Sequence, residues 1–286
     1  MSKVAIVIDS TTNLPLDVMK QYDIREIHSV VIWSGEELLD RVDIQPTEFY
    51  QRLSTAAEMP TTSQATPGEA KEVLEQLASE GVKDVLAIHL SDKLSGTIGS
   101  MEQAIALKEA DINVEIVNTK SASMGSGWPI LMAARAAEAG KSMAEVKAVA
   151  EAACQHTGLI LVVDTLEFLH RGGRIGGAQR FIGTALNLKP ILEVQDGAIE
   201  ALERQRTTKK AYNRLVELTE ERIGGRSPVY LAVLHANAAD DAQKVLDMVA
   251  AKVNPVETII AEVSPSVGTH TGPGTVGVAF MAGYEG

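Results

Sequence analysis

The sequence predicts an α/β protein with a mainly parallel sheet in its first half and an antiparallel sheet in its second half. In the first half, short β-branched and apolar runs alternate with helix-like segments, which is typical of parallel strands joined by helices. In the second half, strand-like runs outnumber the helices between them, and Asp196-Gly197 joins two of them in a hairpin pattern. The 286 residues correspond to one large domain or two medium ones.

The elements of the first half follow from apolar runs and capping residues. Val4–Ile8 is continuously apolar, as expected for a strand buried on both faces. Thr66, followed by Pro67 and Glu69, forms a capping-box pattern that opens a helix running to about Ser79. Further predicted strands are Ile27–Trp33, Val85–Leu90 and Val114–Asn118, and further predicted helices are Thr47–Ala57, Thr97–Ala110, Trp128–Ala139 and Met143–Gln155.

The second half is predicted as strands with two helices on one side of the sheet. The predicted strands are Ile160–Val163, Leu192–Gln195, Ala198–Glu203, Val229–His235, Glu257–Val263 and Val276–Tyr284, and the predicted helices are Thr208–Arg222 and Ala239–Lys252. We place the domain boundary so that residues 1–159 form an N-terminal α/β domain and residues 160–286 a C-terminal antiparallel α/β domain. No low-complexity linker separates them, so we expect close packing with a ligand between the domains.

Composition and charge argue against several classes of function. The net charge of −12 repels phosphate backbones, and the 4% aromatic content offers little stacking surface, so nucleic acid is not an expected partner. The single cysteine, Cys154, excludes an internal disulfide and is expected to act as a small buried apolar residue. We find no signal peptide and no apolar stretch approaching the roughly 18 residues of a membrane span, and we expect a cytoplasmic protein.

The common catalytic signatures are missing from the sequence. The histidines are spread out and include no i, i+4 pair, and no CxxC occurs, so neither a metal site nor a cofactor is predicted. Met124–Gly127 misses the spacing of a nucleophile elbow. The glycine-rich run 172–177 has Arg174 where a dinucleotide-binding motif needs glycine. We therefore assign no catalytic residue.

Three segments rich in hydroxyl groups remain, at residues 60–67, 91–97 and 268–274. Ser95, Gly96 and Thr97 fall where a predicted strand gives way to a helix, so backbone N–H groups and the helix dipole favour an anion there. Gly96 would allow a ligand close to the backbone, and hydroxyls donate without a fixed charge. Taken singly, these residues also fit helix caps, a polar turn or a structural histidine, His270.

Five motifs in order resemble the DegV family. They extend from residue 7 to about residue 280, which makes the combination far more specific than any one motif. The matching segments are Asp9-Ser10-Thr11-Thr12-Asn13-Leu14, Thr62-Ser63-Gln64 before Thr66-Pro67, Leu94-Ser95-Gly96-Thr97, Leu166–Ile175 with its Gly-Gly-Arg-Ile, and Gly268-Thr269-His270-Thr271-Gly272-Pro273-Gly274.

The resemblance implies a Rossmann-like N-terminal layer, an antiparallel C-terminal domain and a long-chain, palmitate-like fatty acid buried between them. It also implies that Thr62 and Ser95, with Gly96 and Thr97 beside them, hold the carboxylate, and that His270 belongs to their hydrogen-bond network. The protein would then bind lipid without turning it over, in fatty acid and phospholipid metabolism, and a monomer is expected.

Some family members present the bound fatty acid to a separate ATP-dependent kinase subunit. We see no ATP-binding motif here, so phosphoryl transfer would need that partner. Arg171, Arg174 and Arg206 are the expected docking residues in this otherwise acidic chain; the alternative for them is solvated surface charge.

Two other classes of function stay open at this point. The family resembles in fold the dihydroxyacetone-binding subunit of dihydroxyacetone kinases, so one alternative is a kinase-like or aldol-type enzyme acting on a small carbonyl or phosphorylated metabolite. The other is a regulatory protein that senses acyl chains. A co-purified fatty acid would favour binding, whereas an empty protein that consumes a polar metabolite would favour an enzyme.

Overall fold

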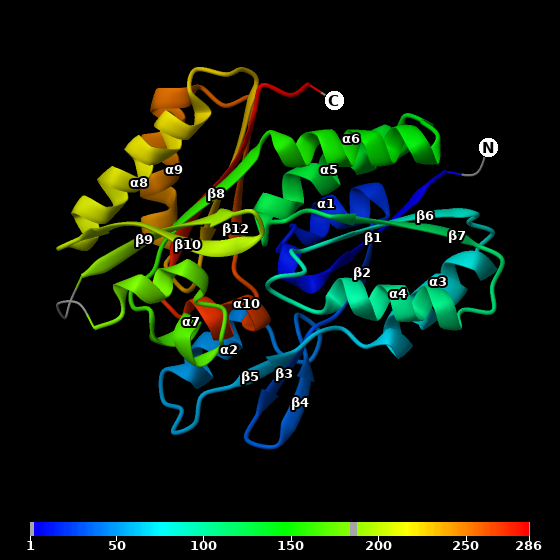
Figure 1. The fold of residues 1–286 in the computed structure, drawn as a ribbon, viewed down its shortest axis with the longest axis horizontal. Helices are drawn as coiled ribbons and strands as arrows, with labels where there is room; N and C mark the ends of the chain where they lie inside the picture. The colour runs from blue at the N-terminus through cyan, green and yellow to red at the C-terminus, as the bar shows by residue number, and fades with distance from the viewer. Residues whose placement is uncertain (1–2, 184–187, 286) are drawn as a thin grey trace.

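The computed structural model, which describes residues 3–183 and 188–285, places a parallel sheet in the N-terminal half of the chain (Figure 1). Its strand order is β2-β1-β6-β7, and all neighbouring strands run parallel. The strands are β1 (Ala5–Asp9), β2 (Arg25–Ile27), β6 (Asp84–His89) and β7 (Asn113–Asn118). The predicted parallel layer is therefore confirmed.

Helices cover both faces of this sheet, which explains why its strands are continuously apolar. Val7 and Ala87 pack with α3 (Pro67–Ser79) and α4 (Thr97–Leu107) on one face. Ile6 and Ile88, one residue away along each strand, pack with the helices of the other face. Those helices are α1 (Leu16–Tyr22), α5 (Met124–Glu138) and α6 (Met143–Gln155).

The C-terminal half forms a six-stranded sheet with the order β10-β9-β8-β13-β11-β12. Its strands are β8 (Thr157–Val162), β9 (Lys189–Gln195), β10 (Ala198–Gln205), β11 (Val229–His235), β12 (Glu257–Glu262) and β13 (Val276–Ala282). The predicted antiparallel pairing holds for all neighbours but one. β11 and β12 run parallel, because α9 (Ala239–Val253) connects them as a crossover.

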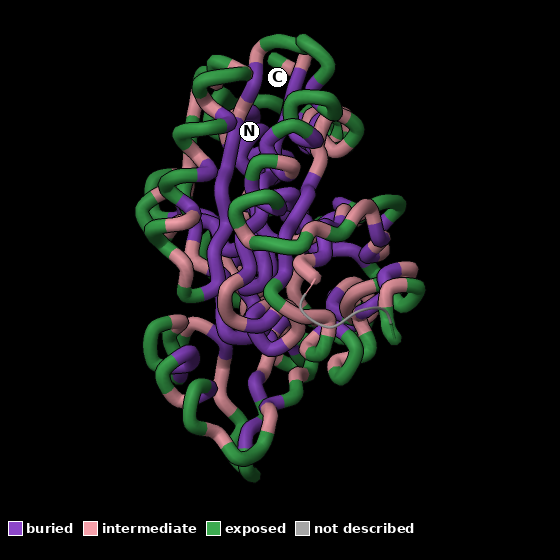
Figure 2. The backbone as a smooth tube through the Cα atoms, turned by 90° about the vertical axis from the view of Figure 1, so that its left-hand side faces the viewer, coloured by how far each residue is buried: buried purple, intermediate pink, exposed green. Residues whose placement is uncertain are grey.

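Helix α5 lies between the two sheets and joins the layers. Its Trp128 is fully buried, and the indole Nε1 donates to the carbonyl of Ala279 in β13 at 3.4 Å. α8 (Thr208–Ile223) and α9 cover the other face of the six-stranded sheet. Figure 2 shows the resulting band of buried backbone through the middle of the molecule. The predicted boundary between residues 159 and 160 lies inside β8, and the division into separate domains stays a prediction.

A small third sheet, β4-β3-β5, lies beside the two layers, with short helices next to it. Its strands are β3 (Val30–Trp33), β4 (Glu36–Leu39) and β5 (Thr61–Ser63), and the nearby helices are α2 (Pro46–Leu53), α7 (Glu167–Arg171) and α10 (Pro265–Thr271). Two 3-10 turns, η1 (Ser10–Thr12) and η2 (Gly176–Phe181), complete the set of elements. Among the described residues, no helix combines the length and apolarity needed to cross a membrane.

The predicted strand Ile27–Trp33 is divided between two sheets. The backbone amides of His28 and Ser29, between the two strands, do not bond to a neighbouring strand. His28 N donates to the Glu69 carboxylate at 2.9 Å, and Ser29 N donates to Ser10 Oγ at 3.2 Å. Ile27 is therefore the last residue of β2, the chain leaves the sheet at His28 and Ser29, and β3 begins at Val30.

The predicted capping box at α3 forms only in part. Thr66 Oγ1 accepts from Glu69 N at 3.1 Å, as predicted. The Glu69 side chain, however, accepts from the backbone and the imidazole of His28, with 2.7 Å to Nδ1. The other ring nitrogen lies 3.4 Å from Glu26, so His28 sits between two carboxylates.

This position makes the stability of the protein sensitive to mildly alkaline pH. Burial acts to lower the pKa of His28, but the hydrogen bonds to Glu26 and Glu69 outweigh it and raise the pKa to about 9 from 6.5. A raised pKa in the folded state stabilises the fold fully below about pH 6.5 and loses that contribution as pH rises through about 9.

We therefore expect the free energy of unfolding to fall by about 1–3 kcal/mol more in the wild type than in His28→Gln between pH 6.5 and 9. Urea denaturation across this range measures the difference. Parallel pH profiles for the two proteins would contradict the assignment of charge to His28.

Candidate ligand-binding site

The site lies where the strand order of the parallel sheet reverses. After β1 the chain continues outwards to β2, and after β6 it continues to β7 on the other side, so a crevice opens beyond the carboxyl ends of β1 and β6. The Asp9 carboxylate ties these two ends together. It accepts from Thr11 N at 3.2 Å, from His89 Nδ1 at 3.1 Å and from Leu90 N at 3.1 Å.

A hollow between the two layers starts at this crevice, with a cavity volume of about 90 Å³ inside a wider space of about 550 Å³ that includes open solvent. Its apolar wall comes from both halves of the chain, through Leu90, Leu94, Ala122, Leu169, Ile199 and Val267. Its polar lining residues are Thr11, Ser29, Ser95, Arg174, Ser266, His270 and Thr271.

A second, outer pocket lies on the other side of His270 and Arg174, which line both spaces. The loop from Ala57 to Thr62 forms one wall of this outer pocket, and Phe168, Arg171 and Gly172 contribute to the other. The imidazole and the guanidinium thus lie where an apolar hollow meets a more polar pocket.

Thr62 and His270 meet at this border, although they are 208 residues apart in the sequence. Thr62 Oγ1 in β5 lies 2.7 Å from His270 Nε2 in α10. Burial, together with the positive charge of Arg174, lowers the pKa of His270 to about 4. The imidazole is therefore neutral near pH 7.

The tautomer of His270 follows from its other ring nitrogen. Nδ1 is buried without a hydrogen-bond partner among the described residues, and it packs so tightly on Gly172 that a Cβ there would lie 2.1 Å away. An orphaned N–H is rarer than an orphaned acceptor, so we assign the proton to Nε2. Thr62 Oγ1 then accepts from His270, and its own proton is free to donate to a ligand.

Ser95 and Thr97 stand at the start of α4, as predicted. Their hydroxyl oxygens are 2.9 Å apart, and Ser95 lines the hollow. Ser95 N does not point outwards, because it donates to Ser91 O at 3.1 Å. The N–H groups left for an anion are those of the first turn of α4, after Ser95.

Gly96 is approached by a side chain of the protein itself. A Cβ at Gly96 would lie 2.8 Å from Nε2 of Gln64, so the Gln64 amide packs against the glycine backbone. The structure thus explains why glycine suits this position through Gln64. A ligand contact at Gly96 stays a prediction.

The three arginines predicted for docking differ in environment. Arg174 is half-buried and bridges the layers, donating from Nε to Leu94 O at 3.0 Å and from Nη1 to Gly172 O at 2.8 Å. Arg171 is exposed beside the outer pocket and pairs with Glu167 at 2.6 Å. Arg206 is exposed between β10 and α8, lines neither space, and has no side-chain partner among the residues described.

Sequence reasoning missed several residues of the hollow. Thr11, Ser29, Ser266 and Thr271 line it, and the last two belong to α10, a helix that the sequence analysis does not predict. Ser264, followed by Pro265, was the available signal: Ser264 is the N-cap of α10 and Pro265 its first residue.

Comparisons with known proteins show what the whole chain is similar to. A family model described as "Uncharacterised protein, DegV family" matches residues 3–283. The DegV domain-containing protein SCO2569 of Streptomyces coelicolor is 37% identical over 280 residues, which cover 98% of each chain. Protein DegV of Bacillus subtilis is 33% identical over 279 residues, covering 97% of this chain and 98% of that protein.

Solved structures of two similar proteins are described in terms of fatty acid binding. A DegV family protein from Thermus thermophilus superimposes with a TM-score of 0.92 at 36% identity, covering 99% of this chain and 100% of the other. DegV from Bacillus subtilis, described as a fatty acid binding protein, gives a TM-score of 0.90 at 31% identity, with coverage of 99% and 100%.

The tight contact at Gly172 gives a direct test of the Thr62–His270 geometry. Gly172→Ala would place a methyl group on His270 Nδ1 and push the ring from Thr62, so we expect a loss of about 1–3 kcal/mol in the free energy of unfolding. Gly68→Ala in α3, where the nearest atom would be 3.8 Å from the new Cβ, is the matched control. Equal stability of the two variants would show that His270 has room to move.

Proposed function

Because this chain belongs to the DegV family, we propose that it binds a long-chain, palmitate-like fatty acid, with the acyl tail in the hollow and the carboxylate at its polar end. Thr62 and Ser95 donate hydroxyl hydrogen bonds to the carboxylate, and the first turn of α4, at Gly96 and Thr97, adds N–H groups. His270 holds Thr62 in the donating orientation. No residue of this chain is assigned a catalytic role.

The observation that carries this proposal is the border formed by His270 and Arg174. The lining surface of the hollow on one side of this border is mostly apolar, and the lining of the outer pocket on the other side is more polar. An amphipathic ligand with one polar end fits such a division, because its tail leaves water while its head group keeps hydrogen-bond donors. The descriptions of similar structures as fatty acid binding proteins support the same ligand class.

The energetics explain why the head-group site contains few charges. A palmitate-sized tail has about fifteen methylenes, each contributing about 0.8 kcal/mol on burial, which amounts to about 12 kcal/mol before ordering costs. The tail therefore supplies the affinity. Neutral hydroxyls need only orient the carboxylate, and a single guanidinium, that of Arg174, balances its charge.

We further propose that the protein presents the bound acid to a separate ATP-dependent fatty acid kinase subunit, as part of cytoplasmic fatty acid and phospholipid metabolism. The outer pocket supports this step, since it leads from solvent to the head-group residues Thr62 and His270. Arg171 and Arg206 are exposed, and Arg174 lies at the border of the pocket; together they form the docking set. The chain acts as a monomer in this proposal.

The ligand is tested by native mass spectrometry of freshly purified protein, in which we expect a co-purified acid of about 14–18 carbons. Thr62→Val removes the hydroxyl and keeps the shape, so fatty acid affinity should fall by about tenfold, as for one lost hydrogen bond to a charged group. A titration with a fluorescent fatty acid measures this change.

Thr258→Val is the control for that substitution, because Thr258 is exposed on β12, remote from the hollow. Its affinity should match the wild type. Protein that is empty on purification and does not bind C14–C18 acids would refute the proposal, and consumption of a polar metabolite would favour an enzyme.

Arg206 tests the presentation step separately from binding. Arg206→Glu should slow acyl-phosphate formation by the kinase subunit about tenfold or more, since charge reversal at a docking surface mainly slows association. Fatty acid affinity should not change. Lys141→Glu, an equal change of charge at an exposed site between α5 and α6, serves as control. Equal rates for the two variants would exclude docking at Arg206.

A further inference from the structure

Helix α10 supplies a large part of the hollow but is too short to hold itself in place. It has seven residues, and its Ser266, Val267, His270 and Thr271 all line the space. Isolated helices of this length are unstable in water. The orientation of His270 must therefore come from contacts made by α10 with the rest of the protein.

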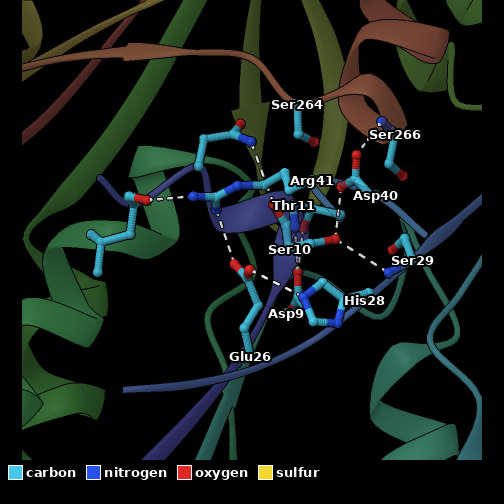
Figure 3. Close-up of polar contacts among 12 residues, drawn as sticks. Asp9, Ser10, Thr11, Glu26, His28, Ser29, Asp40, Arg41, Ser264 and Ser266 are labelled. Atoms are coloured by element: carbon cyan, nitrogen blue, oxygen red, sulfur yellow. Dashed lines mark hydrogen bonds and ion pairs between the residues drawn. The ribbon is translucent and has the colours of Figure 1, made fainter. Parts of the chain in front are cut away.

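Asp40 makes the contact that anchors the start of α10. This side chain is fully buried at the end of β4. Its Oδ1 accepts from Ser266 N at 2.9 Å, and its Oδ2 accepts from Ser10 Oγ at 2.7 Å. Ser10 Oγ in turn accepts from Ser29 N at 3.2 Å. Figure 3 shows these contacts. They connect α10 with Asp40 after β4, with Ser10 after β1, and with Ser29 just before β3.

The charge of Asp40 is held by hydrogen bonds and not by a direct ion pair. Arg41 lies next to it in the sequence, but its guanidinium bonds Glu26 at 2.9 Å and Leu14 O at 2.9 Å. Burial raises the pKa of Asp40 to about 6, while the hydrogen bonds from Ser10 and Ser266 act to lower it. Hydrogen bonds to an ionised acceptor are short and strong, so they hold Ser266 firmly in place. Burial of the Asp40 carboxylate away from water opposes this stabilisation.

Other contacts leave α10 little freedom on its remaining sides. A Cβ at Gly268 would lie 2.5 Å from Tyr50 Oη, so Tyr50 of α2 packs closely against the middle of α10. Gly172 presses on His270 itself. Ser266 and His270 are four residues apart, about one helical turn. A movement of Ser266 would therefore carry His270 away from Thr62.

We propose that Asp40 is a positioning residue for the fatty-acid head group: by accepting from Ser266 N and Ser10 Oγ, it sets the place of α10 and so holds His270 against Thr62. This inference rests on the proposed function. It extends the site to a buried carboxylate that does not line the hollow.

Removal of the carboxylate tests this role. Asp40→Ala should weaken fatty acid affinity by about tenfold or more, and Asp40→Asn, whose amide oxygen still accepts from Ser266 N, should restore most of it. Ser10→Ala removes one partner of Asp40 and should weaken affinity about threefold; it serves if Asp40→Ala does not fold. In each weakened variant, the ¹⁵N imidazole signals of His270 in the ligand-free protein should shift and its pKa should rise from about 4 towards 6.5.

A loss of stability alone would not produce these changes. Thr207→Ala removes the N-cap of α8, far from the hollow, and should lower stability while leaving affinity and the His270 signals unchanged. A folded Asp40→Ala or Ser10→Ala protein with wild-type affinity and wild-type His270 signals would overturn the positioning role. A wild-type protein that binds no fatty acid would instead refute the proposed function. The His270 signals of the variants would still show whether the bond from Ser266 N to Asp40 positions His270.

Discussion

The candidate site depends on one hydrogen bond between the two halves of the chain, from His270 in α10 to Thr62 in β5. It is the point at which the outer pocket and the apolar hollow meet. Because Nδ1 of His270 is packed on Gly172 and has no described partner, the ring has one orientation in which a hydrogen bond forms. This contact fixes the imidazole and the Thr62 hydroxyl relative to each other, which would lower the ordering cost of the proposed binding.

Charge at this border is concentrated on one group. Burial, together with the positive charge of Arg174, lowers the pKa of His270 and keeps its imidazole neutral. Two of the five N–H donors of Arg174 go to Leu94 O and Gly172 O, so the side chain is fixed and still has donors left. Two cations next to each other would cost desolvation energy twice, whereas one cation and one neutral donor can complement a single carboxylate.

The sequence was sufficient to predict the layers and most of the elements, because their signals are local. The continuously apolar Val4–Ile8 predicts β1, and Thr66 followed by Pro67 predicts the start of α3, where Thr66 Oγ1 accepts from Glu69 N. The break at His28 and Ser29 could not be predicted in this way, because their amides bond residues distant in the sequence, Glu69 and Ser10.

Motif resemblance predicts Thr62, Ser95 and His270 as site residues. The structure places Ser95 and His270 at the hollow, with Thr62 bonded to His270, and their contact with a ligand stays a prediction. The resemblance could not identify Asp40, because a lone acidic residue after a short strand is ordinarily a surface residue. Only the fold brings that carboxylate to Ser266, 226 residues away. Burial of an ionisable group is a property of the assembled layers and has no local signature.

The state of His270 also bears on the choice between binding and turnover. A general base near neutral pH needs a pKa close to the working pH and an accessible nitrogen. His270 has a pKa of about 4, one nitrogen buried against Gly172 and the other bonded to Thr62. Such a ring is a poor proton acceptor but a well-oriented donor. The same desolvation that removes its basicity strengthens its hydrogen bond to Thr62, so the chemistry of this histidine favours holding a head group over transforming it.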